Sequence, residues 1–274
     1  MTNRTMNAYP GLLIVNADDW GRDARTTGRI LDCFQRRAVS SVSAMVFMED
    51  SERAAAMAQE QGIDAGLHLN LTTRFSAPDC PARLLERQGE LARYLLRHPA
   101  ARVIFNPWLV RDFEYVVTAQ IEEFRRLYQR DPDRVDGHHH MHLSANVLLR
   151  DLLPGGTLVR RHFSFEPGEK ALRNRFFRWF ADAMLARRHR VVDFFFSLPP
   201  LEPPSRLQRI FSLARRFVVE VETHPVKPEE YQFLSGGDIF RLAGDLPIAS
   251  RFASARRKET IHASRRQDQR NEAY

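Results

Sequence analysis

The chain lacks the features that mark secreted and membrane proteins. Its 274 residues include only two cysteines, Cys33 and Cys80, which are too few for a disulfide framework. No run of about 18 apolar residues is long enough to span a membrane, and the N-terminus has no apolar run of the kind found in signal peptides. These absences predict a protein of the reducing cytoplasm without a membrane span.

The chain also lacks sequence motifs that bind nucleic acids or phosphate groups. No segment resembles a nucleic-acid-binding motif, so we expect no DNA or RNA partner, and no glycine-rich phosphate loop follows the first apolar run. Basic charge is in excess, with 41 lysines and arginines against 34 acidic residues and a net charge of +7. Most paired arginines, such as Arg160-Arg161, are interpreted as solvated helix faces. An anionic glycan, a lipid diphosphate or a peripheral contact with a membrane surface is the alternative.

Strand-like and helical patterns alternate along the chain. This alternation predicts parallel strands with right-handed crossovers, and its seven units favour an α/β fold, an irregular (β/α) TIM-like barrel, over an open doubly wound sheet. We predict one domain over residues 1–250 and a flexible basic tail over 251–274. The predicted strands lie near 11–17, 39–47, 63–71, 133–138, 157–161, 191–196 and 217–223. The predicted helices lie near 22–37, 50–61, 112–130, 144–153, 170–188 and 205–215.

The pattern weakens between residues 73 and 111, where four prolines break it into short pieces. One interpretation is a solvated insertion, and the other is a loop that covers a substrate. The sequence alone favours neither.

Four of the ten histidines lie within five residues, in the segment 136–142 with the sequence Asp-Gly-His-His-His-Met-His. If this segment is extended, successive side chains point to opposite faces. One carboxylate and up to three imidazoles then share a face, namely Asp136, His138, His140 and His142. Imidazole is the commonest metal ligand and also carries protons near pH 7. The cluster therefore predicts a metal or catalytic site, with a surface histidine run or a cloning tag as the alternatives.

Two further segments deliver polar side chains at or near the ends of predicted strands. The apolar run 12–17 leads into Asp18 and Asp19, and adjacent carboxylates repel each other unless a cation or a proton separates their roles. His68 lies in a strand-like run near Gly66, where another backbone or a ligand can approach closely. Taken alone, the aspartates could cap a helix and His68 could be a core histidine. Together with the histidine cluster, they predict one site at the carboxyl ends of barrel strands.

Four motifs together resemble the YdjC-like carbohydrate deacetylases, a family that includes chitooligosaccharide deacetylase and hopanoid-associated enzymes. They are Asn16-Ala17-Asp18-Asp19-Trp20-Gly21, Gly66-Leu67-His68-Leu69-Asn70-Leu71-Thr72, the segment 136–142 and Glu222-Thr223-His224-Pro225. The resemblance extends from about residue 11 to about residue 226. It implies a divalent metal held by Asp19, His68 and His138, and an enzyme that removes acetyl groups from N-acetylated amino sugars.

Hydrolysis of an acetamide needs a nucleophile, stabilisation of an oxyanion and a proton for the leaving amine. A divalent cation meets the first two needs by activating water and polarising the carbonyl. Asp18, beside the implied ligand Asp19, is then the candidate general base, and His224 is the candidate general acid. The alternative for His224 is a capping or turn histidine. Ligand type favours Zn²⁺, while the family is also associated with Mg²⁺, so both metals stay open.

The remaining motif residues are assigned to the surroundings of the metal. Trp20, which stands where the family usually has phenylalanine, is predicted to contact the substrate and to shift specificity. Asn70, His140 and His142 are also assigned to substrate binding, with support of the ligands as the alternative role for the two histidines. Asp136 is expected to orient a histidine ring from behind.

The expected substrate is an N-acetylated oligosaccharide or a lipid-linked amino sugar, and a homodimer is expected because barrel enzymes of this size often form one. Two other functions stay open. A metal-dependent phosphoesterase would need more ligands than the three placed here. A catalytically inactive sugar-binding protein would not need the ligands and proton-transfer groups, all of which are present.

Overall fold

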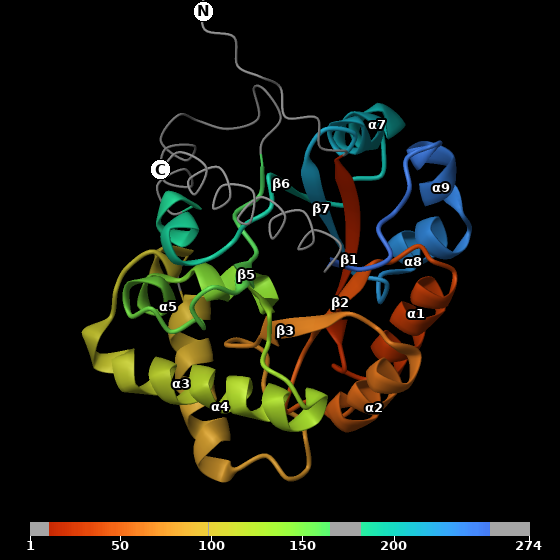
Figure 1. The fold of residues 1–274 in the computed structure, drawn as a ribbon. Helices are drawn as coiled ribbons and strands as arrows, with labels where there is room; N and C mark the ends of the chain where they lie inside the picture. Colours follow the sequence, from red (N-terminus) through yellow and green to blue (C-terminus); the bar gives the residue numbers. More distant parts are fainter. Residues whose placement is uncertain (1–10, 98, 165–181, 253–274) are drawn as a thin grey trace, which may run out of the picture.

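The computed structural model describes residues 11–97, 99–164 and 182–252. In this part of the chain, seven parallel strands form one curled sheet with helices around it (Figure 1). The strands are β1 (Leu12–Trp20), β2 (Ser41–Ala44), β3 (Ala65–Leu69), β4 (Arg134–Gly137), β5 (Leu158–Val159), β6 (Phe194–Ser197) and β7 (Val218–Thr223). The α-helices are α1 (Ala24–Gln35), α2 (Ser51–Gln61), α3 (Ala82–Arg97), α4 (Val110–Tyr128), α5 (Ala145–Leu149), α7 (Pro204–Leu213), α8 (Pro228–Ser235) and α9 (Asp238–Ala243). Three 3-10 helices are η1 (Pro99–Arg102), η2 (Pro107–Leu109) and η3 (His138–Leu143).

The strand order shows how the sheet closes. Neighbouring strands follow the order β5-β4-β3-β2-β1-β7-β6, so the chain runs around the sheet without the reversal that defines a doubly wound fold. Just before β6, Arg190 forms a parallel bridge with Leu158, and its carbonyl accepts a hydrogen bond from Val159 N at 2.8 Å. The two edges of the sheet therefore meet. The predicted irregular barrel of seven parallel strands in a single domain is confirmed.

The two faces of β1 show how the sequence builds this barrel. Leu13, Val15 and Ala17 are completely buried in the main apolar core with residues of the surrounding helices. The alternate residues Asn16 and Asp18 instead contact polar side chains of other strands, because successive side chains of a strand point to opposite faces. One face thus anchors the helices, and the other fills the barrel with polar groups.

The amino-terminal end of the barrel is covered by residues 248–252. Ala249 N donates a hydrogen bond to Leu13 O at 2.8 Å, and Phe252 packs in a small apolar cluster with Ile14. Phe252 is 5% exposed, so the start of the predicted tail is packed against the barrel. The rest of that tail, 253–274, lies outside the described residues.

The segment 73–111 differs from its prediction. It contains α3, a helix of 16 residues, so the expectation of short pieces throughout was wrong. Pro81 stands directly before this helix, and Pro99 stands two residues after its end. Proline is tolerated at helix borders and not in their interiors. These prolines therefore lie at the two ends of a helix and do not interrupt it.

Other helices differ at their ends or were missed. The helix predicted over 144–153 is the shorter α5, and the one predicted over 170–188 is described only over 182–188, where it is helical. Helices α8 and α9 were not predicted. Asp23 caps α1 by accepting a hydrogen bond from Thr26 N at 2.8 Å, so the neighbouring Asp18 and Asp19 are not its cap.

Candidate active site

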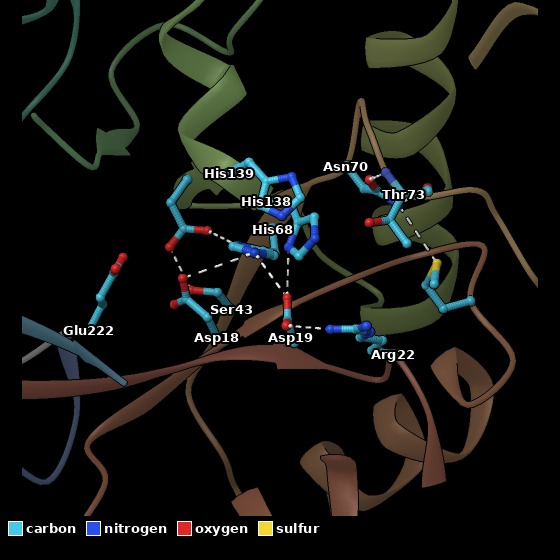
Figure 2. Close-up of polar contacts among 12 residues, drawn as sticks. Asp18, Asp19, Arg22, Ser43, His68, Asn70, Thr73, His138, His139 and Glu222 are labelled. Carbon is cyan, nitrogen blue, oxygen red and sulfur yellow. Dashed lines mark hydrogen bonds and ion pairs between the residues drawn. The ribbon is translucent and has the colours of Figure 1, made fainter. Parts of the chain in front are cut away.

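Asp19, His68 and His138 come together at the carboxyl ends of their strands (Figure 2). Asp19 is the penultimate residue of β1, His68 lies in β3, and His138 follows β4 directly. His138 Nδ1 lies 2.9 Å and His68 Nε2 3.4 Å from Asp19 Oδ1. One ligand atom from each residue lies within 4.8 Å of the others. The three side chains could therefore share one ion.

Two atoms of this group lie close to each other and to His138 but form no hydrogen bond among the described residues. Asp19 Oδ1 and His68 Nε2 are buried without a hydrogen bond in the described structure, although such atoms are normally paired. Arg22 holds the other oxygen of Asp19, Oδ2, at 3.1 Å, so that Oδ1 faces the histidines. Two imidazoles and one carboxylate are a ligand set that suits zinc or another first-row ion. The residues present thus fit a divalent cation.

The charges around His68 favour a cation in the same place. Burial alone would lower the pKa of His68, but Asp18, Asp136 and Asp19 together raise it to about 10. Burial pushes the pKa of Asp19 upward, yet its contacts with His138 and His68 hold it well below its usual range. The site therefore stabilises added positive charge.

Asp136 lies behind His68. Its Oδ1 is 2.7 Å from His68 Nδ1, and its Oδ2 accepts a hydrogen bond from Ser43 Oγ at 2.5 Å. Burial works against ionisation of Asp136, but Arg160 and His68 hold its pKa below the usual range. Since an ionised carboxylate only accepts hydrogen bonds, Nδ1 of His68 carries the proton and Nε2 points toward Asp19. This is the geometry of a group that orients a metal-binding ring.

Arg160 occupies the centre of the barrel interior. Its guanidinium forms two hydrogen bonds with Asp18, at 2.7 and 2.8 Å. It also lies 3.0 Å from Asp136, 2.8 Å from Glu220 and 3.3 Å from Glu222. The Arg160 side chain is 1% exposed, so its interpretation as part of a solvated helix face was wrong. Its position one residue after β5, in the predicted strand 157–161, was the signal that could have identified it.

The buried surroundings shift the pKa values of Asp18 and Glu222 in opposite directions. Burial raises the pKa of Asp18, but Arg160 and His68 together outweigh that effect and bring it below the usual value. Burial and the neighbouring Asp18 raise the pKa of Glu222 well above its usual value, against the opposing effect of Arg160. Glu222 Oε2 lies 3.7 Å from His140 Nε2. Glu222 belongs to the last of the four sequence motifs, but the sequence predicted no role for it.

The histidine segment is not extended beyond Gly137. Strand β4 ends there, and His139 and His140 take left-handed backbone conformations with φ of 54° and 58°. The predicted alternation of side chains therefore holds for Asp136 and His138 and was wrong from His139 onward. His139 Nδ1 lies 3.0 Å from Thr72 Oγ1, and its ring is 4.0 Å from that of His138. His139, which had no assigned role, thus stands beside a candidate ligand.

A sequence model of the YdjC-like protein family matches residues 12–261. The chain belongs to the YdjC-like family. The chitooligosaccharide deacetylase of Yersinia pestis (strain Pestoides F) is 33% identical over 137 residues, which are 50% of this chain and 52% of that protein. That of Serratia marcescens is 31% identical over the same shares. The chain thus spans about half the length of the curated relatives it matches.

A solved structure shares the fold of this YdjC-like chain. It comes from Enterococcus faecalis V583, and its name assigns it provisionally to cellobiose-phosphate cleavage. The TM-score is 0.61 at 17% identity, over 88% of this chain and 97% of the other. No helix among the described residues is long and apolar enough to cross a membrane.

Three residues assigned to substrate binding lie in the packing around the YdjC-like site. Trp20 is completely buried and donates a hydrogen bond from Nε1 to Ala54 O at 3.2 Å. Asn70 is also buried, and its Oδ1 accepts from the backbone N atoms of the turn that follows β3. His142 Nε2 lies 2.9 Å from Arg160 O. These contacts organise the walls of the site and do not support direct contact with a substrate.

The ring of His142 also explains why residue 137 is a glycine. A Cβ atom on Gly137 would lie 2.8 Å from His142 Nδ1, so the close approach of this ring requires glycine there. Gly66 has the same role for a different side chain, because its Cβ atom would lie 2.6 Å from Arg134 Nε. The close approach at Gly66 is therefore made by an arginine side chain and not by the backbone or ligand that the sequence predicted.

His224 follows β7 at the same end of the barrel. Its backbone N donates a hydrogen bond to Glu230 Oε2 at 2.8 Å, and its ring atom Nδ1 is buried without a partner. In the described part of the chain, no hydrogen bond or ion pair joins it to Asp18, Asp19 or His68. The structure thus places His224 at the correct end without a direct link to the candidate metal ligands.

Proposed function

We propose that this protein is a metal-dependent hydrolase that removes the acetyl group from an N-acetylated amino sugar in an oligosaccharide or glycolipid. The observation that carries the proposal is that Asp19 Oδ1 and His68 Nε2 are buried without a hydrogen bond in the part of the chain that the structure describes, close to His138 and next to the fixed carboxylate of Asp18. The names of the matched relatives, chitooligosaccharide deacetylases, support an amino-sugar substrate.

Asp19, His68 and His138 would hold one divalent ion. When bound, such an ion acts as a Lewis acid toward the acetamide carbonyl and lowers the pKa of water. Nitrogen ligands favour Zn²⁺, whereas Mg²⁺ prefers oxygen and would keep several waters. The contact of Asp136 with His68 fixes the ring that would face the ion.

Asp18 is the proposed general base. Arg160 and Asn16 hold its two oxygens through hydrogen bonds of 2.7 to 2.8 Å, so the carboxylate cannot rotate freely. Its Oδ2 lies 4.0 Å from His68 Nε2, at the edge of the proposed metal site. A carboxylate fixed here can accept the proton of a water that attacks the carbonyl carbon.

Two groups are candidates for protonating the leaving amine. His224 remains the proposed acid, and its unpartnered Nδ1 is consistent with a role in proton transfer. Glu222 is the second candidate because its raised pKa favours the protonated form and because it lies between Arg160 and His140. A carboxyl group kept protonated by burial can act as a general acid.

Release of acetate tests the function. Protein loaded with zinc or magnesium is incubated with N-acetylated chitooligosaccharides of increasing length and with a lipid-linked N-acetylated amino sugar. The proposal predicts one free amine for each acetate released. Release of phosphate from sugar phosphates without acetate would identify a phosphoesterase. Binding of the sugar without any release would identify an inactive sugar-binding protein.

A further inference from the structure

Residues 96–97 and 99–111, here called the rim segment, carry an unusual concentration of exposed apolar side chains. Of the eight large apolar residues that are exposed in the described structure, four belong to this segment. They are Leu96 (59% exposed), Val103 (46%), Ile104 (56%) and Trp108 (87%). Apolar side chains gathered in this way commonly mark an interaction surface.

The rim segment lies at the end of the barrel that carries the candidate site. Helix α4 ends at Tyr128, shortly before β4 begins, and its 19 residues span about 28 Å. Its first turn, next to Trp108, therefore lies near the carboxyl ends of the strands. Asn106 also exchanges two hydrogen bonds with Asn146 of α5, at 2.8 and 2.9 Å, and α5 directly follows the histidines of η3. Figure 1 shows the yellow rim segment at the outer edge, next to α3 and α5.

Hydrogen bonds hold the rim segment in this exposed form. Tyr94 Oη donates to Ile104 O at 3.0 Å, and the side chain of Asn106 accepts from Trp108 N at 3.0 Å. Leu96 and Trp108 line one shallow hollow between the end of α3 and η2. The apolar side chains are thus presented outward by an ordered frame.

Between Glu90, which lines the same hollow, and Asp112, the charge of the chain has one sign. Residues 91–111 contain four arginines and no aspartate or glutamate. The arginines are Arg93, Arg97, Arg102 and Arg111, and all four are exposed. Arg93 lies 3.7 Å from Glu90 on the preceding turn of α3, whereas no ion pair of the other three is found among the described residues. Three cationic groups therefore surround the apolar side chains without an acidic partner.

We propose that the rim segment binds the surface of an anionic lipid bilayer. Aliphatic side chains and a tryptophan enter the boundary between head groups and acyl chains, and surrounding arginines pair with lipid phosphates. A subsite for a sugar chain would need free polar partners for hydroxyl groups, whereas Tyr94 Oη and Asn106 Oδ1 in this hollow are already bound to backbone groups of the segment. A self-association face would bring like charges together. Docking in this orientation turns the candidate site toward the membrane, where a lipid-linked amino sugar is presented. This last step rests on the proposed function.

Co-sedimentation of the full chain with vesicles tests the proposal without any activity measurement. Vesicles of phosphatidylcholine alone are compared with vesicles that also contain phosphatidylglycerol. We expect binding to the anionic vesicles only, weakened by raised salt, because screening shortens the reach of charge interactions. Equal binding to both vesicle types, or no binding to either, would overturn the proposal.

Matched variants locate the contact. The double variant Ile104→Ser/Trp108→Ala should bind anionic vesicles at least tenfold more weakly, and Arg97→Glu/Arg102→Glu should do the same. Phe240→Ser and Arg37→Glu alter an exposed apolar residue and an exposed arginine outside the rim segment and should bind like the parent protein. Equal weakening by the control variants would contradict the proposal.

Two further measurements distinguish a membrane contact from a bound sugar chain and from a second copy of the chain. If the rim segment held a sugar chain, Ile104→Ser/Trp108→Ala would raise KM for long soluble chitooligosaccharides while leaving vesicle binding unchanged, which would overturn the proposal. If it held a second copy of the chain, the parent protein would dimerise and the variant would be monomeric by analytical ultracentrifugation, again with vesicle binding unchanged. Absence of acetate release from every substrate would refute the proposed function and leave the vesicle result intact.

Discussion

Arg160 and Asp18 form a bidentate ion pair inside the barrel, with N–O distances of 2.7 and 2.8 Å and side chains that are 1% and 3% exposed. The pair joins the residue after β5 to the end of β1, across the interior. Asp18 is thereby fixed beside Asp19, which is a candidate metal ligand. One arginine thus positions the proposed base and compensates the acidic residues that surround it.

Loss of this arginine should destabilise the fold. Arg160→Met leaves Asp18, Asp136, Glu220 and Glu222 without their shared cation, and we expect a loss of about 3–5 kcal/mol in the free energy of unfolding. Arg161→Met is the matched control, because Arg161 pairs with Asp182 while 26% exposed and should cost roughly 1 kcal/mol. Urea denaturation measures both. Equal losses would show that the buried network does not depend on Arg160.

The neighbouring aspartates should have separable roles. Asp18→Asn should keep the metal and lose activity by about 10²–10⁴-fold, because the base is removed while all three ligands remain. Asp19→Asn should lose the metal itself, since it changes the oxygen that lies close to both histidines. Elemental analysis and initial rates distinguish them. Normal metal content in both variants, or loss of metal in Asp18→Asn alone, would reverse the assignment.

Substrates with different leaving groups can identify the residue that acts as the general acid. An acid that protonates an amine matters for amides and hardly for activated acetate esters, whose leaving groups depart without a proton. His224→Ala should therefore impair amide substrates far more than esters. Glu222→Gln serves as the comparison. The selective loss appearing in Glu222→Gln and not in His224→Ala would transfer the role to Glu222.

Glu222 should also influence how stability depends on pH. In chelator-treated protein its pKa is raised well above the usual 4.5. Below pH 4.5 the carboxyl is protonated in both folded and unfolded chains, so its contribution is fully present there. As pH rises toward the raised pKa, the unfolded chain releases its proton while the folded chain retains it, and stability falls. The variant Glu222→Gln should not lose stability in this way, because glutamine does not ionise.

The measurement is the difference in Tm between Glu222→Gln and the parent from pH 4 to pH 8. We expect the variant to gain relative stability as pH rises, and the exposed Glu229→Gln to show no such trend. A pH-independent difference would mean that Glu222 ionises normally in the folded protein.

The sequence predicted the barrel because its signals are local and repeated. The apolar β-branched run before Asp18 and the strand-like run around His68 each identify a parallel strand, and parallel strands bring their carboxyl ends to one side. The motifs that contain Asp19, His68 and His138 could be grouped for the same reason, and the resemblance to the YdjC-like family implied these three residues as the ligands, although the first and the last lie 119 positions apart.

The conformation of the histidine segment and the burial of Arg160 could not be predicted, because they depend on contacts between segments far apart in the sequence. His139 and His140 leave the extended conformation where the ring of His142 packs on Gly137 and its Nε2 lies beside the carbonyl of Arg160. Arg160 is exposed or buried according to which strands face it, and no feature of the dipeptide Arg160-Arg161 reveals four carboxylates from β1, β4 and β7. These features arise only once the barrel has formed.

The most direct test measures acetate release against metal content in the parent protein and in the ligand variants. Protein stripped with a chelator should release no acetate from an N-acetylated chitooligosaccharide and should regain activity on titration with one equivalent of the correct metal. His68→Ala and His138→Ala should keep the fold by circular dichroism yet bind no metal and release no acetate, while His140→Ala should retain its metal. Full acetate release by the stripped protein, or full metal occupancy in His138→Ala, would contradict a metal-dependent deacetylase built on Asp19, His68 and His138.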